Sequence, residues 1–352
     1  MSAPLADDPR ATDRRTWGRR TVAAAVCVMI AGIAAIGLVL TRSTADDVTA
    51  ELRTAVATGE TTLDGTEPML LFANTALGDS YGHLAMVASA DPGGPRGVGD
   101  LQCERVHYRD GRGICLRANR GADTTYDAVL FDEALAIGDR IPLAGPPSRA
   151  RVSPGGQLAA ATAFVTGHAY ENSGFSTDTI LIDIDTGRVI ASIEADFTVL
   201  RDGQPWSEED FNFWGVTFVD GNEFYATLGT GGISYLVAGD IDRREMVVME
   251  AGVECPSLSP DGLRLAYKRP VETADGARFQ LEVIDLETRA VTVVAETRSV
   301  DDQVAWLDDD TIMYGLRDPD SPAESDTWAV PADGTGSPVL LVPGAWSTAL
   351  VP

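Results

Sequence analysis

The chain has 352 residues, and its 53 acidic residues against 27 basic ones give a formal net charge of −26. So acidic a chain lacks the excess of cationic side chains that neutralises phosphates, which argues against a nucleic-acid-binding protein. Its ordinary aromatic content (7%) and polarity argue against wholesale disorder and against a membrane protein with many spans. The 35 glycines and 19 prolines favour a turn-rich, all-β protein.

The N-terminal region has the features of a membrane anchor. Residues 21–40 form an uncharged apolar run, which as a helix of about 30 Å would cross the hydrocarbon core of a bilayer. Arginines lie close before the run and one follows it, so the positive-inside rule places the N-terminus in the cytoplasm and the remainder outside. We therefore expect a cytoplasmic tail at 1–20, a transmembrane helix at 21–41 and a stalk at 42–66, in a single-pass cell-membrane protein. A cleaved signal peptide is the alternative.

A hairpin pattern recurs after the stalk. Residues 152–160 (VSPGGQLAA) and 258–266 (LSPDGLRLA) each indicate a strand, a Pro/Gly turn and a second strand. With weaker copies there are five such hairpins, and a second strand pair follows each by roughly 20 residues. Their spacings are 45, 65, 41 and 47 residues, measured between Gly111, Gly156, Gly221, Gly262 and Asp309. Four-stranded units at this period are typical of β-propeller blades.

A sixth blade can be assembled from the two ends of the repeat region. Strand-like segments lie at 69–75 and 83–89, and the chain finishes in another at 346–351. Joining the last strand to the first blade would remove exposed sheet edges. The sequence therefore predicts an all-β fold: a six-bladed β-propeller over residues 67–352, closed by pairing of its C-terminal and N-terminal strands and preceded by one transmembrane helix.

The hairpin at residues 255–268 (CPSLSPDGLRLAYK) resembles the WD40-like repeat of TolB-type β-propellers. With one anchor and an acidic propeller, the chain is similar to the TolB-like membrane proteins of actinobacteria, over roughly residues 68–352. The resemblance implies a propeller that serves as a binding or scaffolding module, and it carries no catalytic residue with it. TolB itself is soluble and periplasmic, so the anchor is a departure from that pattern.

Three cysteines lie in the part expected outside the cytoplasm, where disulfides can form. Cys103 and Cys115 flank one hairpin, and we predict a disulfide between them. Direct pairing would centre the turn on Arg109, whereas the residues Asp110-Gly111 indicate a turn about one residue later, a difference that a bulge could absorb. Cys255 begins the equivalent hairpin of a distant blade and is expected to be unpaired and buried.

One short motif raises the question of catalysis. Residues 78–82 (GDSYG) match the nucleophile elbow of serine hydrolases, in which a strand-to-helix turn presents the serine beside a histidine. Here a strand-like segment follows, so we interpret the motif as a plain turn. A hydrolase that uses Ser80 is kept as an alternative function.

Acidic pairs raise the question of metal binding. Asp183, Asp185 and Glu194 match part of the spacing of a calcium loop, but Gly187 and Arg188 stand where that loop needs an oxygen ligand and a glycine. We interpret them as turn residues and predict no metal ligand, no cofactor and no catalytic residue. A propeller that binds a sugar or a cation in its central channel is the remaining alternative.

Residues 197–225 hold eight of the chain's 24 aromatic residues and fall within the longest repeat spacing. Extra loops are predicted there, at 167–178 and 200–212, and loops inserted in a repeat array often form its binding face. The candidate binding residues are Trp206, Phe211, Phe213, Trp214, His168 and Tyr170. Packing of the aromatics into a local core is the competing interpretation. The predicted function is non-catalytic recognition of a protein or a cell-envelope component.

Overall fold

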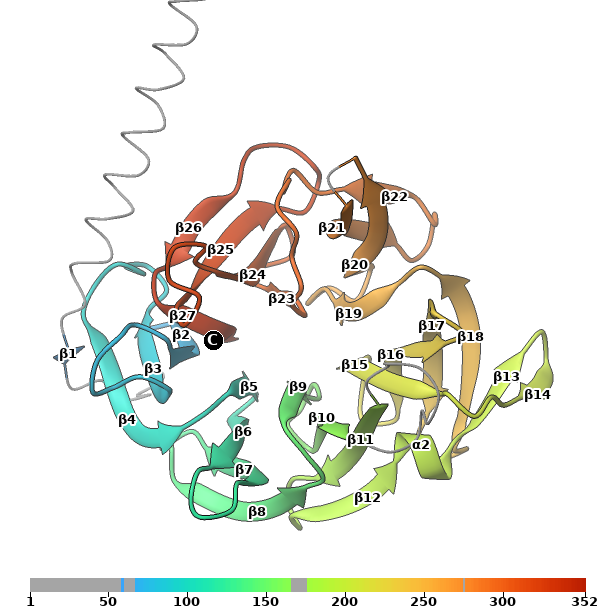
Figure 1. Cartoon of the computed structure of the whole chain (residues 1–352), viewed down its shortest axis with the longest axis horizontal. Helices are drawn as coiled ribbons and strands as arrows, with labels where there is room; N and C mark the ends of the chain where they lie inside the picture. Colours follow the sequence, from blue (N-terminus) through green and yellow to red (C-terminus); the bar gives the residue numbers. More distant parts are fainter. Residues whose placement is uncertain (1–57, 60–66, 166–175, 275) are drawn as a thin grey trace, which may run out of the picture. The chain divides into compact units, whose positions relative to one another are not determined.

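Six β-sheets surround a central axis in the computed structural model, which describes residues 58–59, 67–165, 176–274 and 276–352 (Figure 1). The predicted all-β, six-bladed propeller is therefore confirmed. The transmembrane helix expected at 21–41 lies outside the described residues, as do the tail at 1–20 and all but two residues of the stalk at 42–66. Within the described ranges, no helix has the length and apolar character needed to cross a bilayer.

Blades two to six each have four consecutive strands, with a hairpin added to the fourth, whereas the first combines three consecutive strands with the C-terminal strand and one short strand. The first contains β1 (Thr58–Gly59), β2 (Met69–Asn74), β3 (His83–Ala88), β4 (Arg96–Gln102) and β27 (Ala345–Val351). The second contains β5 (Arg105–Arg109), β6 (Arg112–Asn119), β7 (Thr125–Asp132) and β8 (Ile137–Leu143). The third contains β9 (Pro147–Val152), β10 (Leu158–Val165), β11 (Ser176–Asp183) and β12 (Arg188–Ser192).

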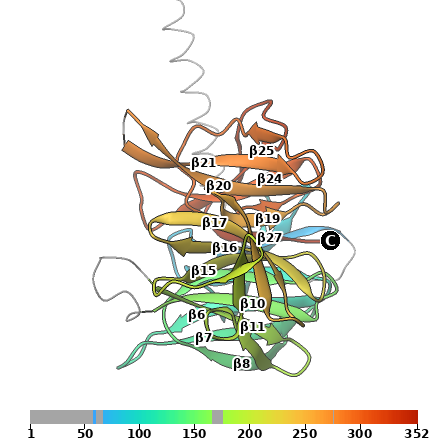
Figure 2. The same cartoon turned by 90° about the vertical axis from the view of Figure 1, so that its right-hand side faces the viewer.

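The remaining blades follow the same order. The fourth contains β15 (Asn212–Phe218), β16 (Glu223–Thr230), β17 (Ile233–Asp240) and β18 (Glu245–Ala251). The fifth contains β19 (Glu254–Leu258), β20 (Arg264–Thr273), β21 (Gly276–Asp285) and β22 (Val291–Val293). The sixth contains β23 (Ala305–Trp306), β24 (Thr311–Arg317), β25 (Ser325–Pro331) and β26 (Val339–Val342). Figure 2 shows the stacked blades from the side.

The long repeat spacing contains an insertion that enlarges the fourth blade. After the short helix α2 (Ile193–Asp196), the chain forms a hairpin of β13 (Thr198–Arg201) and β14 (Gln204–Trp206). Strand β13 pairs in parallel with β18 at the outer edge of the blade, Val199 opposite Met246. The segment predicted as a loop at 200–212 is therefore partly a hairpin, because the exposed edge of β18 offers it backbone partners.

The two ends of the propeller meet in its first blade. The C-terminal strand β27 pairs antiparallel with β2, Met69 opposite Val351, and forms the innermost strand there (Figure 1). The buried Arg96 of β4 adds a side-chain link, since its guanidinium donates to the Pro343 carbonyl oxygen (2.8 Å) and to Asn74 Oδ1 (2.8 Å). The ring is closed by contacts between its first and last strands.

The two most similar repeats form the same turn. In each, a buried serine begins the turn and its Oγ accepts the N–H of the residue five positions later, Leu158 to Ser153 (2.9 Å) and Arg264 to Ser259 (3.0 Å). Gly156 and Gly262 have φ of 70° and 74°, a left-handed conformation that glycine adopts without steric cost. The shared sequence thus encodes a shared hairpin.

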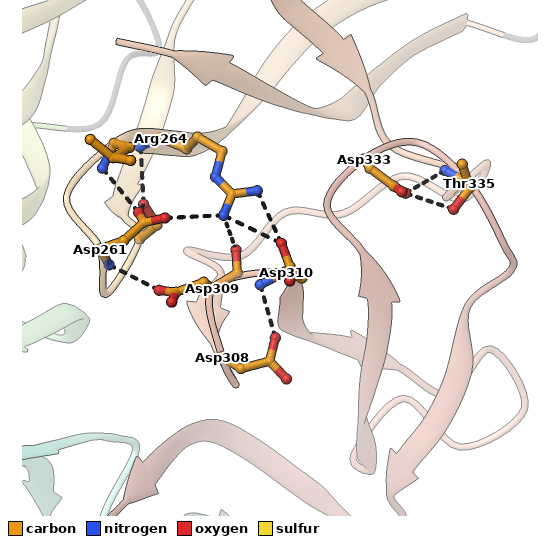
Figure 3. Close-up of polar contacts among 9 residues, drawn as sticks. Asp261, Arg264, Asp308, Asp309, Asp310, Asp333 and Thr335 are labelled. Carbon is orange, nitrogen blue, oxygen red and sulfur yellow. Dashed lines mark hydrogen bonds and ion pairs between the residues drawn. The ribbon is translucent and has the colours of Figure 1, made fainter. Parts of the chain in front are cut away.

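The blades have two chemically different ends. We call the end where the innermost strands begin the loop face; it carries, among others, the loops at 75–82, 207–211, 294–304 and 318–324. We call the opposite end the turn face, where short turns join the strands. Aspartates there accept backbone N–H groups and link neighbouring blades: Figure 3 shows the Asp261 N–H bound to Asp309 (2.9 Å) and Arg264 paired with Asp310 (3.4 Å). Much of the chain's acidity is thus part of its turns.

Candidate functional site

The aromatic residues singled out in the sequence pack mainly on one another. Phe213 is only 2% exposed and belongs to the core of the fourth blade, against which Trp206 and Phe211 pack half-buried. The rings of Trp206 and Phe211 meet edge to face at 5.0 Å, and Arg201 stacks over Trp206 at 4.7 Å. This cluster satisfies the local-core interpretation, and a binding role for its half-buried members stays a prediction.

The other candidates lie apart from this cluster or outside the description. Trp214 covers Gly229, where an added Cβ would come within 2.6 Å of the indole. His168 and Tyr170 lie outside the described residues.

The loop at 207–211 is held in place by one carboxylate. Asp210 accepts hydrogen bonds from the Thr230 hydroxyl (2.5 Å) and the Gly231 N–H (2.7 Å). These bonds hold the pKa of Asp210 below its usual value. The loop is therefore fixed to the β16–β17 hairpin on the loop face, beside the exposed Ile233.

The central channel is crossed by side chains close to the loop face. The short segment 301–304, which precedes β23, extends across the axis to other blades. Arg105 pairs with Asp302 at 2.9 Å, and the Arg151 guanidinium donates to Ser257 Oγ (3.1 Å) and to the Val304 carbonyl. Gln303 donates to the backbone carbonyls of Val216 and Pro256, both at 3.0 Å. The space beside this layer is a cavity of about 20 Å³, enough for about one water molecule.

A second ion-pair network lies at the mouth of the channel. Lys268, the chain's single lysine, contacts the carboxylate of Asp301 and lies 3.5 Å from that of Glu254. Asp301 also lies 3.8 Å from Arg149. Cations from the third and fifth blades therefore share one carboxylate that is delivered by the loop before the sixth blade.

The cations of this mouth are affected strongly by burial. Burial lowers the pKa of Arg105 to about 10, with repulsion by Arg149 adding to the effect and Asp302 opposing it. Burial likewise lowers the pKa of Arg151 to about 10. For Arg149, attraction by the Cys255 sulfur and by Asp302 outweighs burial, and its pKa is raised. All three stay charged at neutral pH and, together with Lys268, form a buried ion-pair cluster with Asp301, Asp302 and Glu254.

The neighbouring His107 belongs to the structural framework of this layer. Burial and the charges of Arg151 and Arg109 hold its pKa well below 6.5, so the ring is neutral at pH 7. Its Nδ1 lies 3.1 Å from the Val152 nitrogen and accepts that N–H. The histidine thus joins β5 to β9.

The cysteine predictions are confirmed. Cys103 and Cys115 form a disulfide with a Cα–Cα distance of 5.4 Å, and Cys255 is free and buried. The turn is Asp110-Gly111, since Arg109 pairs with Arg112. Cys115 then faces Val106, and Cys103 reaches it from the segment before β5.

The serine of the elbow-like motif lies in a turn. Ser80 Oγ accepts the Asn74 side-chain amide at 3.1 Å. The ring of the nearby His83 has other partners, the Gly99 carbonyl oxygen at 2.8 Å and the Gln102 amide at 3.1 Å. Ser80 and His83 are joined only through the backbone in the described part of the chain, the His83 N–H donating to the Ser80 carbonyl oxygen (3.1 Å), and no hydrogen bond links the Ser80 hydroxyl to a histidine ring.

Asp183 and Glu194, which match the calcium-loop spacing, have separate structural roles. Asp183 accepts the N–H (2.8 Å) and the hydroxyl (2.7 Å) of Thr186, which closes the β11–β12 turn. Glu194 instead accepts the Thr179 N–H at 2.8 Å and the Thr177 hydroxyl at 3.1 Å. Burial raises the pKa of Glu194 to about 7, although these hydrogen bonds oppose the shift.

Exposed apolar side chains occur at both faces but in different places. On the described surface, the exposed large hydrophobic residues of the loop face are Leu77, Tyr81, Phe164 and Ile233, and Leu263 lies in a turn of the turn face. The others lie on the fourth strands of their blades, among them Ile137, Val189, Val291 and Val339 at the strand ends next to the turn face. At the loop face, exposed apolar groups lie in the same loops as the charged channel mouth.

The mouth was not predicted from the sequence. Its members lie far apart in the chain, at 105, 149, 151, 254, 268 and 301–303. The only local signal is charge within otherwise apolar inner strands, as in Arg149-Ala150-Arg151-Val152. Buried charges need partners, so such a strand indicates carboxylates somewhere across the channel.

No protein-family description and no curated protein sequence matches the chain. Its fold is similar to TolB from Acinetobacter baumannii, with a TM-score of 0.53 and 17% identity over 82% of this chain and 67% of TolB. A puromycin-hydrolyzing peptidase of Mycobacterium tuberculosis gives a TM-score of 0.47 and 15% identity, covering 79% of this chain and 44% of the peptidase. At these identities the similarity concerns the fold alone. The TolB-type resemblance of residues 255–268 is confirmed at that level: the chain folds as a TolB-like six-bladed propeller.

Proposed function

We propose that the protein is a non-catalytic binding module that recognises a protein or a cell-envelope component through its loop face. In this proposal one N-terminal helix anchors it in the cell membrane and the propeller lies outside the cytoplasm. The Cys103–Cys115 disulfide supports an oxidising compartment, and the apolar run at 21–40 supports the anchor.

The observation that carries the proposal is the asymmetry between the two faces. The turn face is built from short turns whose aspartates are engaged in hydrogen bonds, as in Figure 3. The loop face carries exposed apolar side chains in its loops, the loop at 207–211 fixed by Asp210, and the ion-pair cluster of the channel mouth. Exposed apolar groups beside charged anchors are typical of interaction surfaces.

Photo-crosslinking with the full chain in its native cells tests this proposal. A photoreactive amino acid replaces Ile233 on the loop face, and in a matched variant it replaces Leu263 on the turn face; the two side chains are 49% and 58% exposed. We expect a discrete crosslinked species from position 233 and none from position 263. Equal crosslinking from both positions, or from position 263 alone, would contradict the proposal.

A further inference from the structure

We infer that the channel mouth binds a carboxylate of an acidic peptide between Arg149 and Lys268, and that Asp301 occupies this site in the free protein. The inference rests on the proposed function, because it names the chemistry by which the loop face holds its partner. Asp301 is then an internal substitute that a partner's carboxylate displaces.

The first support is the contrast in burial across one ion pair. The Lys268 side chain is 4% exposed, whereas that of Asp301 is 68% exposed. The Lys268 ammonium group also lies 4.0 Å from the centre of the Phe279 ring, so a second side chain holds it in position. The carboxylate thus approaches a buried cation from the solvent side, which is the path that an external carboxylate would take.

The second support is the local balance of charge. The four cations Arg105, Arg149, Arg151 and Lys268 face the three carboxylates of Glu254, Asp301 and Asp302, with the Cys255 sulfur beside Arg149, so that loss of Asp301 removes one of few negative charges from the cluster. Arg149 also has a buried Nε without a hydrogen-bond partner. Because a buried cation without a partner is strongly unfavourable, removal of Asp301 leaves a site that favours another anion.

The third support indicates a peptide as the source of the carboxylate. Asp301 and Asp302 are neighbours in the chain, and the two carboxylates reach different cations. Asp302 is buried and also accepts the Gly315 N–H at 3.1 Å, so it belongs to the framework. A stretch of polypeptide with an acidic side chain therefore already fits this mouth, and only the exposed Asp301 can be exchanged.

The test uses the full chain with Asp301→Ala and follows its thermal unfolding. The probe is N-acetyl-aspartate amide, and N-acetyl-asparagine amide is the control, since it differs only in the carboxylate. At a concentration of about ten times Kd, we expect the aspartate compound to raise Tm by about 2–4 °C and the asparagine compound to leave it unchanged. A matched variant, Asp242→Ala, removes an exposed aspartate from the turn face and should show no response.

Further arms decide between carboxylate and general anion binding. The double variant Arg149→Gln/Asp301→Ala should lose the response to the aspartate compound. Equal responses to the two compounds, stabilisation by inorganic phosphate alone, or a response that persists without Arg149 would overturn the inference. If Asp301→Ala does not fold, Asp301→Asn keeps the side-chain shape, and recovery of folding in the aspartate compound becomes the measurement. The crosslinking at position 233 is independent of these results, so failure here leaves the proposed function standing.

Discussion

Aspartate has two different tasks in this protein. On the turn face its carboxylates accept backbone N–H groups within tight turns, as Asp183 and Asp333 do, and these bonds lower their pKa. At the channel mouth Asp301 and Asp302 instead neutralise buried cations. One residue type thus supplies surface turns in one place and the partners of buried charge in another.

The Ser80 side chain provides a prediction about catalysis. Because its hydroxyl accepts an amide hydrogen bond and makes no hydrogen bond to the ring of a described histidine, we expect a fluorophosphonate reagent to leave Ser80 unlabelled. The measurement is intact mass after incubation, compared between the native chain and Ser80→Ala. A reagent adduct that is present in the native chain and lost in the variant would instead support the hydrolase alternative.

Individual residues differed in how far the sequence could place them. The disulfide was predictable because both cysteines flank one hairpin, so local geometry brings them together. The channel mouth was not, because Arg149 and Asp301 meet only after six blades have closed into a ring. Which side chains pair in the channel mouth depends on how the ring closes, and no local pattern in a single sequence encodes that closure.

Among the elements, the hairpins of the repeats were the most predictable and the insertion the least. A buried serine and a left-handed glycine produce the same turn at 153–156 and 259–262. By contrast, the parallel pairing of β13 with β18 joins segments without any repeated motif. The aromatics of the insertion signalled a structural irregularity, and the structure shows them stabilising the enlarged fourth blade.

The helix α2 carries a titration that we expect to measure. The pKa of Glu194 is raised from 4.5 to about 7 in the folded protein, so the folded state favours the neutral carboxyl group. That stability is fully present below about pH 4.5 and is lost as pH rises through about 7, by up to about 3 kcal/mol. Glu194→Gln keeps a neutral side chain at all pH values. The Tm of the variant minus that of the native chain should therefore increase between pH 5 and pH 8.

A matched substitution controls for the general effect of charge. Glu133 is exposed in the β7–β8 turn, and Glu133→Gln removes the same charge without a burial effect. A difference in Tm between native chain and Glu194→Gln that stays constant with pH would refute the assignment, as would an equal pH response in Glu133→Gln.

At the scale of the whole molecule, stability depends on the last strand. Removal of residues 345–352 would uncover the inner edge of β2, including the fully buried Leu70 and Leu71. We expect loss of cooperative thermal unfolding and increased binding of a hydrophobic dye. Removal of Pro352 alone, which lies beyond β27, should leave the unfolding curve unchanged. A shortened chain with native Tm would show that the ring does not need this strand.

The closure by β27 has a consequence for how the protein folds. The first blade combines strands from the two ends of the propeller sequence, so it stays incomplete until β27 has paired with β2. Until then β2 presents an open strand edge, the feature through which strands of other chains pair. The ring therefore protects its first blade from foreign strands only once its last strand is in place.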